Sequence, residues 1–269
     1  MQYDPIKRSL GKVFNRHPRL RILFYRLLDI LLLRTWHIKR EIRQLKPSMP
    51  DNPSILDAGS GFGQYSYYLA KKFPSGKVIG IDIKDEQIID CNDFAHEIDL
   101  AERLSFKVAD LTLFRETEKF DIILSVDVME HISEDVTVFV NLYDSLKKGG
   151  TLLISTPSDQ GGSDVHGEGE TSFIDEHVRD GYNSKEIENK LRKAGFSKVK
   201  VMYSYGSPGK ISWKLSMKYP VSMLNVSKIF FLILPFYYLI TFPFCLLLNL
   251  ADVHMYHVQG TGLIVKAVK

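Results

Sequence analysis

The sequence predicts an α/β fold built on a doubly wound, mostly parallel sheet. Three observations support this fold class. A chain of 269 residues with 45% hydrophobic residues is long and apolar enough for one large domain. Short β-branched runs alternate with segments of helical periodicity, which favours parallel strands joined by right-handed crossovers. A glycine-rich turn joins the first of these strands to the first of these helices.

The predicted elements begin after a proline-rich segment, Lys46–Pro53, that no helix can continue through. The predicted strands are Ser54–Asp57, Val78–Ile83, Leu104–Ala109, Asp121–Val126, Leu152–Ser155, Val199–Tyr205 and Leu263–Val268. The predicted helices are Gln64–Lys72, Glu86–Leu100, Glu134–Leu146 and Ser184–Ala194, the last with Ser184 as its N-cap and Gly195 after its end.

Charge is distributed unevenly along the chain. Residues 1–46 carry twelve Lys and Arg against three acidic residues, a charge of +9, so within a net charge of +3 the rest of the chain carries −6. The basic segment favours an anionic partner, whereas the acidic remainder argues against nucleic acid along the whole surface. Two cysteines make no disulfide framework and indicate a reducing, cytoplasmic compartment. We expect no secretory signal, because Arg26 and Asp29 interrupt the early apolar stretch.

The strongest functional signal is a strand that runs into three alternating glycines, Gly59, Gly61 and Gly63, before a helix. Glycines let the backbone turn sharply and approach a ligand closely. The helix N-terminus that follows offers unpaired N–H groups to an anion. A structural turn between a strand and a helix also needs a glycine, but three exceed that need. The pattern therefore predicts a ligand-binding turn.

Acidic residues close the first three predicted strands. Asp57 precedes the turn, and Asp82 ends the second strand, where a carboxylate can bind both hydroxyls of a ribose. Asp110, with Leu111 beside it, is placed to accept a hydrogen bond from an adenine amino group. A dinucleotide fingerprint needs a further glycine where Gln64 stands. Each acid alone is typical of a helix cap, but three at one sheet edge indicate a nucleoside site.

Together these segments resemble class I S-adenosylmethionine-dependent methyltransferases over about residues 51–206 and the last strand. The segments that carry the resemblance are Asp57–Gly63, Gly80–Asp82, Ala109–Leu111, Asp121–His131 and Leu146–Ile154. The resemblance implies seven strands, the last antiparallel and next to the fifth, and S-adenosylmethionine as cofactor. Within the superfamily, Val128–His131 and Ser155–Pro157 are similar to ubiquinone-biosynthesis O-methyltransferases and their small-molecule relatives.

The resemblance also implies which residues bind the cofactor. Gly59 and Gly61 would contact its methionine portion, Asp82 its ribose, and Asp110 with Leu111 its adenine, while Ser125–Val128 would line it from the fourth strand. The complete set of predicted cofactor-binding residues is Asp57, Gly59, Ser60, Gly61, Gly63, Asp82, Ile83, Asp110, Leu111, Asp127 and Val128.

His131 is the predicted catalytic base, because it follows the fourth strand and histidine exchanges protons near neutral pH. The alternative is a histidine that only fixes the turn at a helix start. The long segment Pro157–Tyr182 carries five glycines and predicts a lid that gates the acceptor. His166, Asp175, Glu176 and His177 lie in it without a recognised ligand spacing, so no metal is predicted.

Residues 19–46 form the first of two segments that predict contact with a membrane surface. Apolar residues recur on one face of a basic helix, although Arg34 interrupts the stripe; they are Leu20, Leu23, Phe24, Leu27, Leu31, Ile38, Ile42 and Leu45. Such a helix either lies in a bilayer interface, packs on the domain or forms a substrate lid.

Residues 211–256 form the second segment. Ile229–Ala251 contains no charge over twenty-three residues, enough to cross about 30 Å of hydrocarbon. One crossing would separate two strands of the same sheet, so Pro235 and Pro243 predict broken helices that enter the membrane and return. Lys210, Lys214, Lys218 and Lys228 are expected near the entrance of this monotopic insert. The alternatives are a buried helical cap and a homodimer interface.

The sequence thus predicts a basic arm (1–50), a methyltransferase domain (51–210 and 257–269) and an apolar insert (211–256). The predicted function is methyl transfer from S-adenosylmethionine to a lipophilic small molecule or lipid precursor, by O-methylation, on the inner face of a membrane. One alternative is a nucleic-acid methyltransferase that uses the basic arm, which Ser125–Val128 disfavours because amino-methylating enzymes have two prolines there. The other is a non-catalytic S-adenosylmethionine-binding module tethered to a membrane complex.

Overall fold

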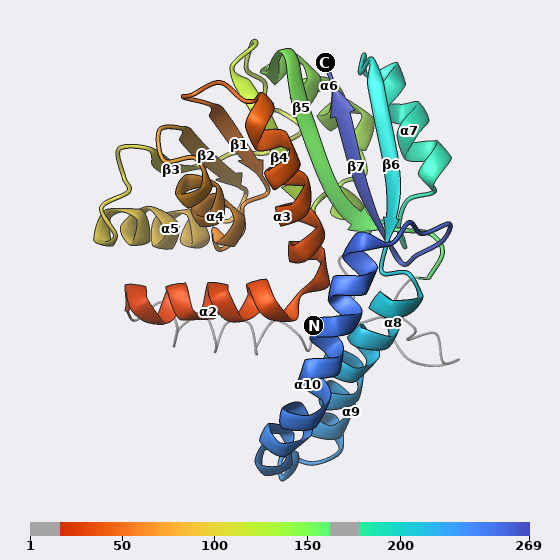
Figure 1. Cartoon of the computed structure of the whole chain (residues 1–269). Coiled ribbons are helices and arrows are strands. Elements are labelled where there is room, and N and C mark those ends of the chain that lie inside the picture. The colour runs from red at the N-terminus through yellow and green to blue at the C-terminus, as the bar shows by residue number, and fades with distance from the viewer. Residues whose placement is uncertain (1–16, 162–177) are drawn as a thin grey trace.

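The computed structural model describes residues 17–161 and 178–269 and is built around one sheet (Figure 1). Seven strands lie in the order β3-β2-β1-β4-β5-β7-β6, and β7 runs antiparallel to both of its neighbours. The strands are β1 (Ser54–Ala58), β2 (Lys77–Asp82), β3 (Leu104–Val108), β4 (Phe120–Val126), β5 (Leu146–Pro157), β6 (Lys198–Ser204) and β7 (Gly262–Val268). The predicted sheet is therefore confirmed, including the last strand next to the fifth.

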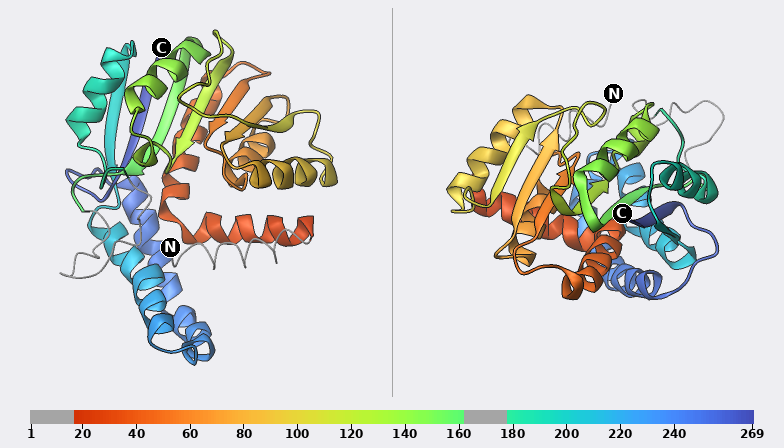
Figure 2. Two further views of the ribbon diagram at one scale, coloured as in Figure 1. Left: turned by 180° about the vertical axis from the view of Figure 1, so that it is seen from behind. Right: turned by 90° about the horizontal axis from the view of Figure 1, so that it is seen from above.

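Helices cover both faces of the sheet, as the back and top views in Figure 2 show. On one face α3 (Leu33–Leu45), α4 (Gln64–Lys72) and α5 (Asp85–Glu97) bury a core that includes Ile38, Ile42 and Leu69. On the other face α6 (Asp135–Ser145) and α7 (Ser184–Lys193) bury a second core around Phe139 and Leu191. Because both faces are covered, the central strands read as continuous apolar runs in the sequence.

Two predicted boundaries differ from the structure. The fifth strand starts six residues before the predicted Leu152, because Leu146 already pairs with Phe120 and a bulge separates this pair from the next. The N-cap of α7 is Asn183 and not Ser184. The Asn183 side chain accepts from the backbone N–H groups of Lys185 and Glu186 at 3.0 and 3.4 Å.

The N-terminal arm forms two helices where the sequence predicted one continuous face. An extended residue, Leu32, separates α2 (Pro18–Leu31) from α3, so the apolar stripe is divided between two directions. The α3 part packs on the sheet, as one sequence alternative proposed. On α2 the predicted positions Leu20, Leu23 and Leu27 face outward and are 40–48% exposed.

Residues 207–254 form a helical hairpin that projects from the sheet (Figure 1). The chain leaves through α8 (Ser207–Trp213), a π-helix (Lys214–Lys218) and α9 (Tyr219–Val226), and returns through α10 (Phe230–His254). The chain does return toward the sheet, but the prediction that Pro235 and Pro243 break the helix is wrong, because both lie inside α10. Between the two prolines α10 is bonded to the outgoing chain: the Tyr237 and Tyr238 hydroxyls donate to the Leu215 and Ser216 carbonyls at 2.8 and 2.7 Å.

The reversal at residues 227–229 also corrects the predicted position of Lys228. This residue lies in the turn at the far end of the hairpin and not near its entrance. Among the described residues, α10 is the helix that is long and apolar enough to cross a membrane. Its outer face is largely exposed, with Leu232 at 73%, Leu239 at 76% and Leu247 at 65%. The opposite face packs on the outgoing helices.

A fully buried carboxylate, Asp252, fixes the base of the hairpin. It accepts from the backbone N–H groups of Gly209 (2.9 Å) and Tyr205 (3.2 Å). The His37 ring Nε2 of α3 lies 2.8 Å from one of its oxygens, and that of His257 lies 3.3 Å from the other. One side chain thereby joins the returning helix, the outgoing helix, the end of β6 and the N-terminal arm.

We expect Asp252→Ala to lower the free energy of unfolding by about 3–5 kcal/mol, because removing the buried carboxylate leaves the groups that donate to it without an acceptor. Denaturant titration followed by circular dichroism measures this change. The matched control is Glu188→Ala, which breaks the exposed pair with Arg192 and should cost less than about 1 kcal/mol. Equal effects of the two substitutions would contradict a clamping role for Asp252.

Candidate functional site

The glycine turn lies where β1, β2 and β4 end. The backbone N–H groups of Gly59 and Ser60 both donate to the Ile81 carbonyl, at 2.9 and 2.8 Å. Gly59 has a φ of +84°, and a Cβ there would lie 2.3 Å from a methyl group of Val128, so only glycine fits. Gly61 has a φ of +51° and open space where its Cβ would be. The backbone at Gly61 is therefore accessible to a ligand.

Asp82 closes this turn from the end of β2. Its Oδ2 accepts from the Gly61 N–H at 2.9 Å and its Oδ1 from the Lys84 N–H at 3.1 Å. A carboxylate has about four acceptor positions, so it retains capacity for two hydroxyl donors. Ile83 beside it is 66% exposed and offers an apolar surface at the same edge.

Asp57 and Gly63 hold the turn from behind. Asp57 is 2% exposed and accepts from the Ser66 hydroxyl of α4 at 2.5 Å. Burial raises the pKa of Asp57 to about 7. Gly63 starts α4 with a φ of +82°, and a Cβ there would lie 3.1 Å from both Cys91 and Phe106. These two predicted residues fix the strand and the helix rather than opening onto the same surface as Gly61.

Asp110 and Leu111 follow β3 at the same edge, because the Ala109 N–H donates to the Asp82 carbonyl at 3.0 Å. The exposed Asp110 accepts from both the backbone and the hydroxyl of Thr112 at 2.8 Å, which is a capping interaction. Leu111 is 5% exposed and packs in the core. Both of these bonds use Oδ1 of Asp110, so its Oδ2 could still accept the predicted hydrogen bond from adenine.

The donor set at this edge fits S-adenosylmethionine. Two buried hydroxyls, those of Ser60 and Ser125, have no hydrogen-bond partner within the described residues. Such groups are expected where a polar ligand supplies the missing partner. The open backbone at Gly61 and the Ser60 hydroxyl suit the methionine portion, and Asp82 suits the ribose.

A cluster that the sequence analysis largely missed lies beside Asp127. The carboxylate of this residue forms an ion pair with Arg34 of α3, and its φ of +52° lies in the left-handed region, which Asp adopts more readily than most side chains. The Arg34 backbone N–H donates to the hydroxyl of Tyr205 at 3.1 Å, and Tyr205 also has a positive φ of +53°. The interruption of the apolar stripe by Arg34 was the sequence signal for this contact.

Glu130 and His131 occupy a short 3₁₀ turn (Met129–His131) after β4, and their environments differ. His131 is exposed, and its backbone N–H donates to the Val128 carbonyl at 3.0 Å. Glu130 is 1% exposed and accepts from the Thr156 hydroxyl at 3.0 Å. Burial, with the negative charge of Asp127 nearby, raises the pKa of Glu130 to about 8. Glu130 is therefore a second candidate base, which the sequence analysis did not single out.

The helix α2 covers the glycine turn. The Arg21 guanidinium donates to the carbonyls of Phe62 and Asp90, both at 2.8 Å, and the Tyr25 hydroxyl donates to the same Phe62 carbonyl. Arg21 and Tyr25 are buried although they belong to a surface helix. The inner face of the arm thus contacts the candidate site directly.

The predicted lid is described only at its two ends. After the undescribed part, the Val178 N–H donates to the Glu130 carbonyl at 3.1 Å, and Arg179 forms an ion pair with Asp135. His166, Asp175, Glu176 and His177 lie outside the described residues. Within 17–161 and 178–269, no group of three or more His, Cys, Asp or Glu is arranged to hold a metal ion.

Comparison with known proteins relates this chain to methyltransferases. A family model described as a methyltransferase domain matches residues 50–204. Phosphoethanolamine N-methyltransferase 1 of Zea mays is 30% identical over 157 residues, which cover 57% of this chain and 30% of that protein. The chloroplastic tocopherol O-methyltransferase of Arabidopsis thaliana is 36% identical over 103 residues, 38% of this chain and 29% of that protein. The chain spans less than half the length of these relatives.

Among solved structures, phosphoethanolamine N-methyltransferase 2 of Haemonchus contortus in complex with S-adenosyl-L-methionine superimposes with a TM-score of 0.62. The match covers 87% of this chain and 52% of that chain, at 22% identity, and so shows the shared fold. The family match, the sheet order and the glycine turn agree. The chain belongs to the methyltransferase-domain family, with the fold of the class I S-adenosylmethionine-dependent enzymes.

Proposed function

We propose that this protein transfers a methyl group from S-adenosylmethionine to a lipophilic small molecule or lipid precursor at a membrane surface. One observation carries the proposal: the cofactor edge and the apolar hairpin share one end of the sheet. Because β7 is antiparallel to both β5 and β6, β6 runs parallel to β5, and the hairpin leaves from the same edge as Gly61 and Asp82. A membrane at the hairpin would face the acceptor side of the site.

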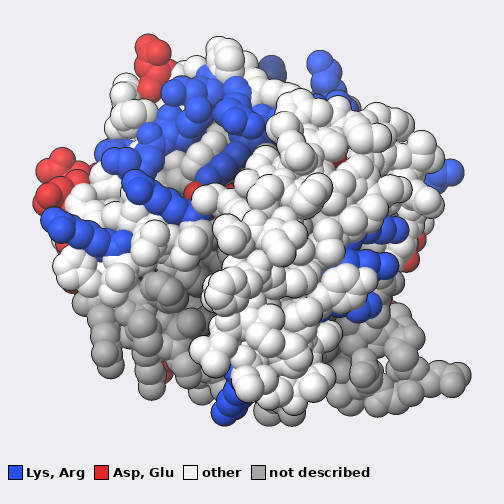
Figure 3. All heavy atoms as spheres, turned by 60° about the horizontal axis from the view of Figure 1, so that its bottom comes forward, with Lys and Arg blue, Asp and Glu red and all other residues white. Residues whose placement is uncertain are grey.

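The surface of the hairpin supports contact with lipid. Figure 3 shows it as an almost uncharged area, with Lys and Arg side chains gathered beside it. An exposed apolar area of this kind is typical of interaction sites, and adjacent basic groups favour anionic lipid headgroups. The exposed leucines on the outer face of α2 provide a second apolar contact.

When bound, S-adenosylmethionine supplies a methyl group that is already activated for transfer by its positive sulfur. The chain has to bind the cofactor and the acceptor, orient them toward each other and exclude water. Holding two reactants in line is worth about 7–11 kcal/mol of the barrier. Asp82 and the glycine turn would orient the nucleoside, and Glu130 or His131 would take the proton from an oxygen acceptor. The relative named for tocopherol supports O-methylation of a lipophilic acceptor.

We expect Asp82→Asn to weaken S-adenosylmethionine binding by about 10- to 100-fold, because a charge-assisted hydrogen bond is worth about 1.5–3 kcal/mol. Isothermal titration calorimetry measures the affinity. Glu188→Gln, on the exposed face of α7, is the control and should bind as the wild type does. A folded Asp82→Asn protein with unchanged affinity would exclude Asp82 from the site.

We expect kcat/KM to rise with pH through about 8, because the Glu130 carboxyl must lose its proton before it can act as base. Glu130→Gln should lower kcat at least about tenfold and remove this limb of the pH profile.

His131→Ala is the paired test. If His131 is the base, its removal lowers turnover at least about tenfold with cofactor affinity intact, and the Glu130→Gln profile keeps its shape. The labelled-methyl assay uses total lipid extract as acceptor.

We expect the full chain to float with phosphatidylcholine–phosphatidylglycerol vesicles and to stay bound at high salt, because apolar insertion is not screened. The double variant Phe236→Glu, Leu239→Glu changes two side chains that are 69% and 76% exposed and should lose flotation. Leu113→Glu, which is 82% exposed on another surface, is the matched control. Flotation that disappears with salt in the wild type, or survives in the double variant, would contradict insertion of the hairpin.

A further inference from the structure

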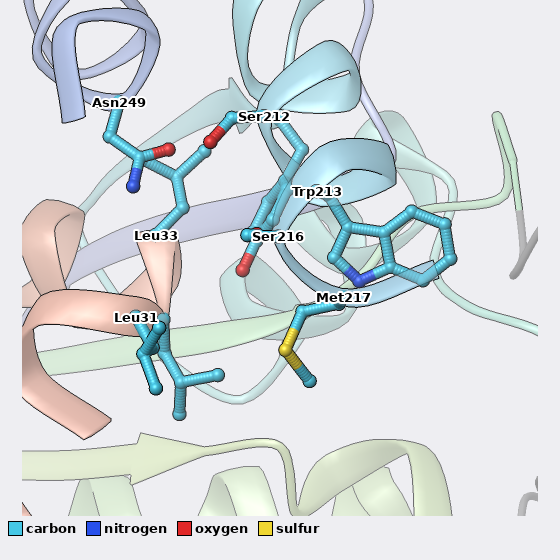
Figure 4. Close-up of a pocket in the computed structure, with 9 residues that line it drawn as sticks. Leu31, Leu33, Ser212, Trp213, Ser216, Met217 and Asn249 are labelled. Atoms are coloured by element: carbon cyan, nitrogen blue, oxygen red, sulfur yellow. The ribbon is translucent and has the colours of Figure 1, made fainter. Parts of the chain in front are cut away.

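A narrow groove lies between the junction of the two arm helices and the base of the hairpin (Figure 4). Leu31 lines it from the arm, and Trp213 and Met217 line it from the outgoing part of the hairpin. Its free space is about 10 Å³, which accommodates about one water molecule. An acceptor molecule therefore does not fit there. The contacts that organise the turn around Glu130 come instead from residues 178–182.

The short 3₁₀ turn that carries Glu130 is closed by backbone bonds between residues three apart. The His131 N–H donates to the Val128 carbonyl at 3.0 Å. The Ile132 N–H donates to the Met129 carbonyl at 3.4 Å. Hydrogen bonds in 3₁₀ turns have poorer geometry than those in α-helices, so such a turn adds little stability by itself. Its conformation, and with it the direction of the Glu130 side chain, therefore depends on contacts from other segments.

The chain just before α7 supplies such contacts. The Val178 N–H donates to the Glu130 carbonyl at 3.1 Å. Nη2 of Arg179 donates to the Ile132 carbonyl at 2.7 Å and to the Ser133 carbonyl at 3.3 Å. These carbonyls belong to the turn itself and to the residues that lead from it into α6. Arg179 thereby binds the exit of the turn from outside.

The other end of the Arg179 guanidinium is anchored to buried groups. Its Nη1 forms an ion pair with Asp135, which starts α6 and also pairs with Lys190 of α7 at 2.8 Å. The guanidinium lies over the ring of the fully buried Tyr182, 4.8 Å from its centre. The Tyr182 hydroxyl lies 2.7 Å from the Asp135 carboxylate and 3.1 Å from the Met129 carbonyl of the turn. Arg179 therefore connects the turn rigidly to α6 and α7.

We propose that Arg179 is a positioning residue for methyl transfer, which holds the turn so that Glu130 can act as base on the acceptor. The proposal rests on the proposed function, because it takes Glu130 as the group that receives the proton of the acceptor. An arginine suits this role. Its planar guanidinium donates from separate nitrogens at fixed angles, so it binds the Asp135 carboxylate with one Nη and the backbone carbonyls with the other. A lysine donates from a single nitrogen, which cannot lie close to both sets of acceptors.

The Glu130 carboxyl is enclosed by groups from several elements, so its protonation reports whether the turn is closed. Burial raises its pKa to about 8, with the negative charge of Asp127 acting in the same direction. The Thr156 hydroxyl of β5, which donates at 3.0 Å, and the Arg34 guanidinium of α3 act in the opposite direction. The Tyr182 hydroxyl also lies within electrostatic range of this carboxyl. Because burial is the largest of these effects, a loosened turn would admit water and lower the pKa of Glu130.

The test measures kcat for labelled-methyl transfer into total lipid extract with Arg179→Lys, Glu130→Gln and the double variant. Arg179→Lys keeps a positive charge opposite Asp135 and should fold, which circular dichroism checks. We expect it to lower kcat at least about tenfold with S-adenosylmethionine affinity unchanged, because a misplaced group loses the advantage of orientation. Since Arg179 acts through Glu130, the double variant should match Glu130→Gln within about twofold. Arg192→Lys, paired with Glu188 on the exposed side of α7, is the matched control and should keep the wild-type kcat.

A second measurement needs no acceptor. The difference between the proton titrations of the wild type and of Glu130→Gln gives the midpoint at which this carboxyl loses its proton. We expect the same difference, taken in the Arg179→Lys background, to have a midpoint at least about one pH unit lower, because water then reaches the carboxyl. In the Arg192→Lys background the midpoint should not move.

Multiplied losses of kcat in the double variant would overturn the proposal, because Arg179 would then act independently of Glu130. Wild-type kcat in folded Arg179→Lys, or in Glu130→Gln, would overturn it as well. A lowered midpoint without methyl transfer to lipid extract would reject the proposed function and retain the hold of Arg179 on Glu130. Methyl transfer with an unchanged midpoint would reject the positioning role alone.

Discussion

The buried carboxylate of Asp252 is the interaction on which the arrangement around the site depends. A charge with no solvent exposure is tolerated only where polar groups surround it. Here hydrogen bonds come from α3, α8 and the end of β6, and the His257 ring, which is hydrogen-bonded to the Asp252 backbone carbonyl, lies beside the carboxylate. Its partners are far apart in the sequence. By joining them, Asp252 fixes the hairpin against the arm, and so fixes the groove that both of them line.

The same constraint connects the hairpin with the chemistry of the site. Tyr205 donates its backbone N–H to Asp252 and accepts from Arg34 through its hydroxyl. Arg34 in turn pairs with Asp127, which lies just before the turn that carries Glu130. A short series of contacts therefore runs from the base of the hairpin to the end of β4. The family match covers residues 50–204 and so excludes both Arg34 and the hairpin. Both therefore lie outside the part of the chain that the methyltransferase-domain family defines.

Local patterns made the sheet and the cofactor edge predictable. Buried parallel strands are continuous apolar runs, and a turn such as that at Gly59 needs glycine for reasons that act within a few residues. The division of the arm at Leu32 and the continuity of α10 through Pro235 depend instead on tertiary packing, which periodicity does not contain. The pairing of Arg34 with Asp127 is equally non-local. The sequence showed that Arg34 was out of place on an apolar stripe, but only the fold shows what it contacts.

The contact between α2 and the glycine turn has a consequence for the timing of the reaction. A single carbonyl, that of Phe62, accepts from both Arg21 and Tyr25. Lifting the helix would break both bonds together and expose the buried side chains of Arg21 and Tyr25 to water. We therefore expect a nucleoside held beneath it to exchange only when the helix moves away. The motion of this helix, and not the transfer step, would then govern how long the cofactor stays bound after it has lost its methyl group. It would thereby also govern the rate of successive turnovers.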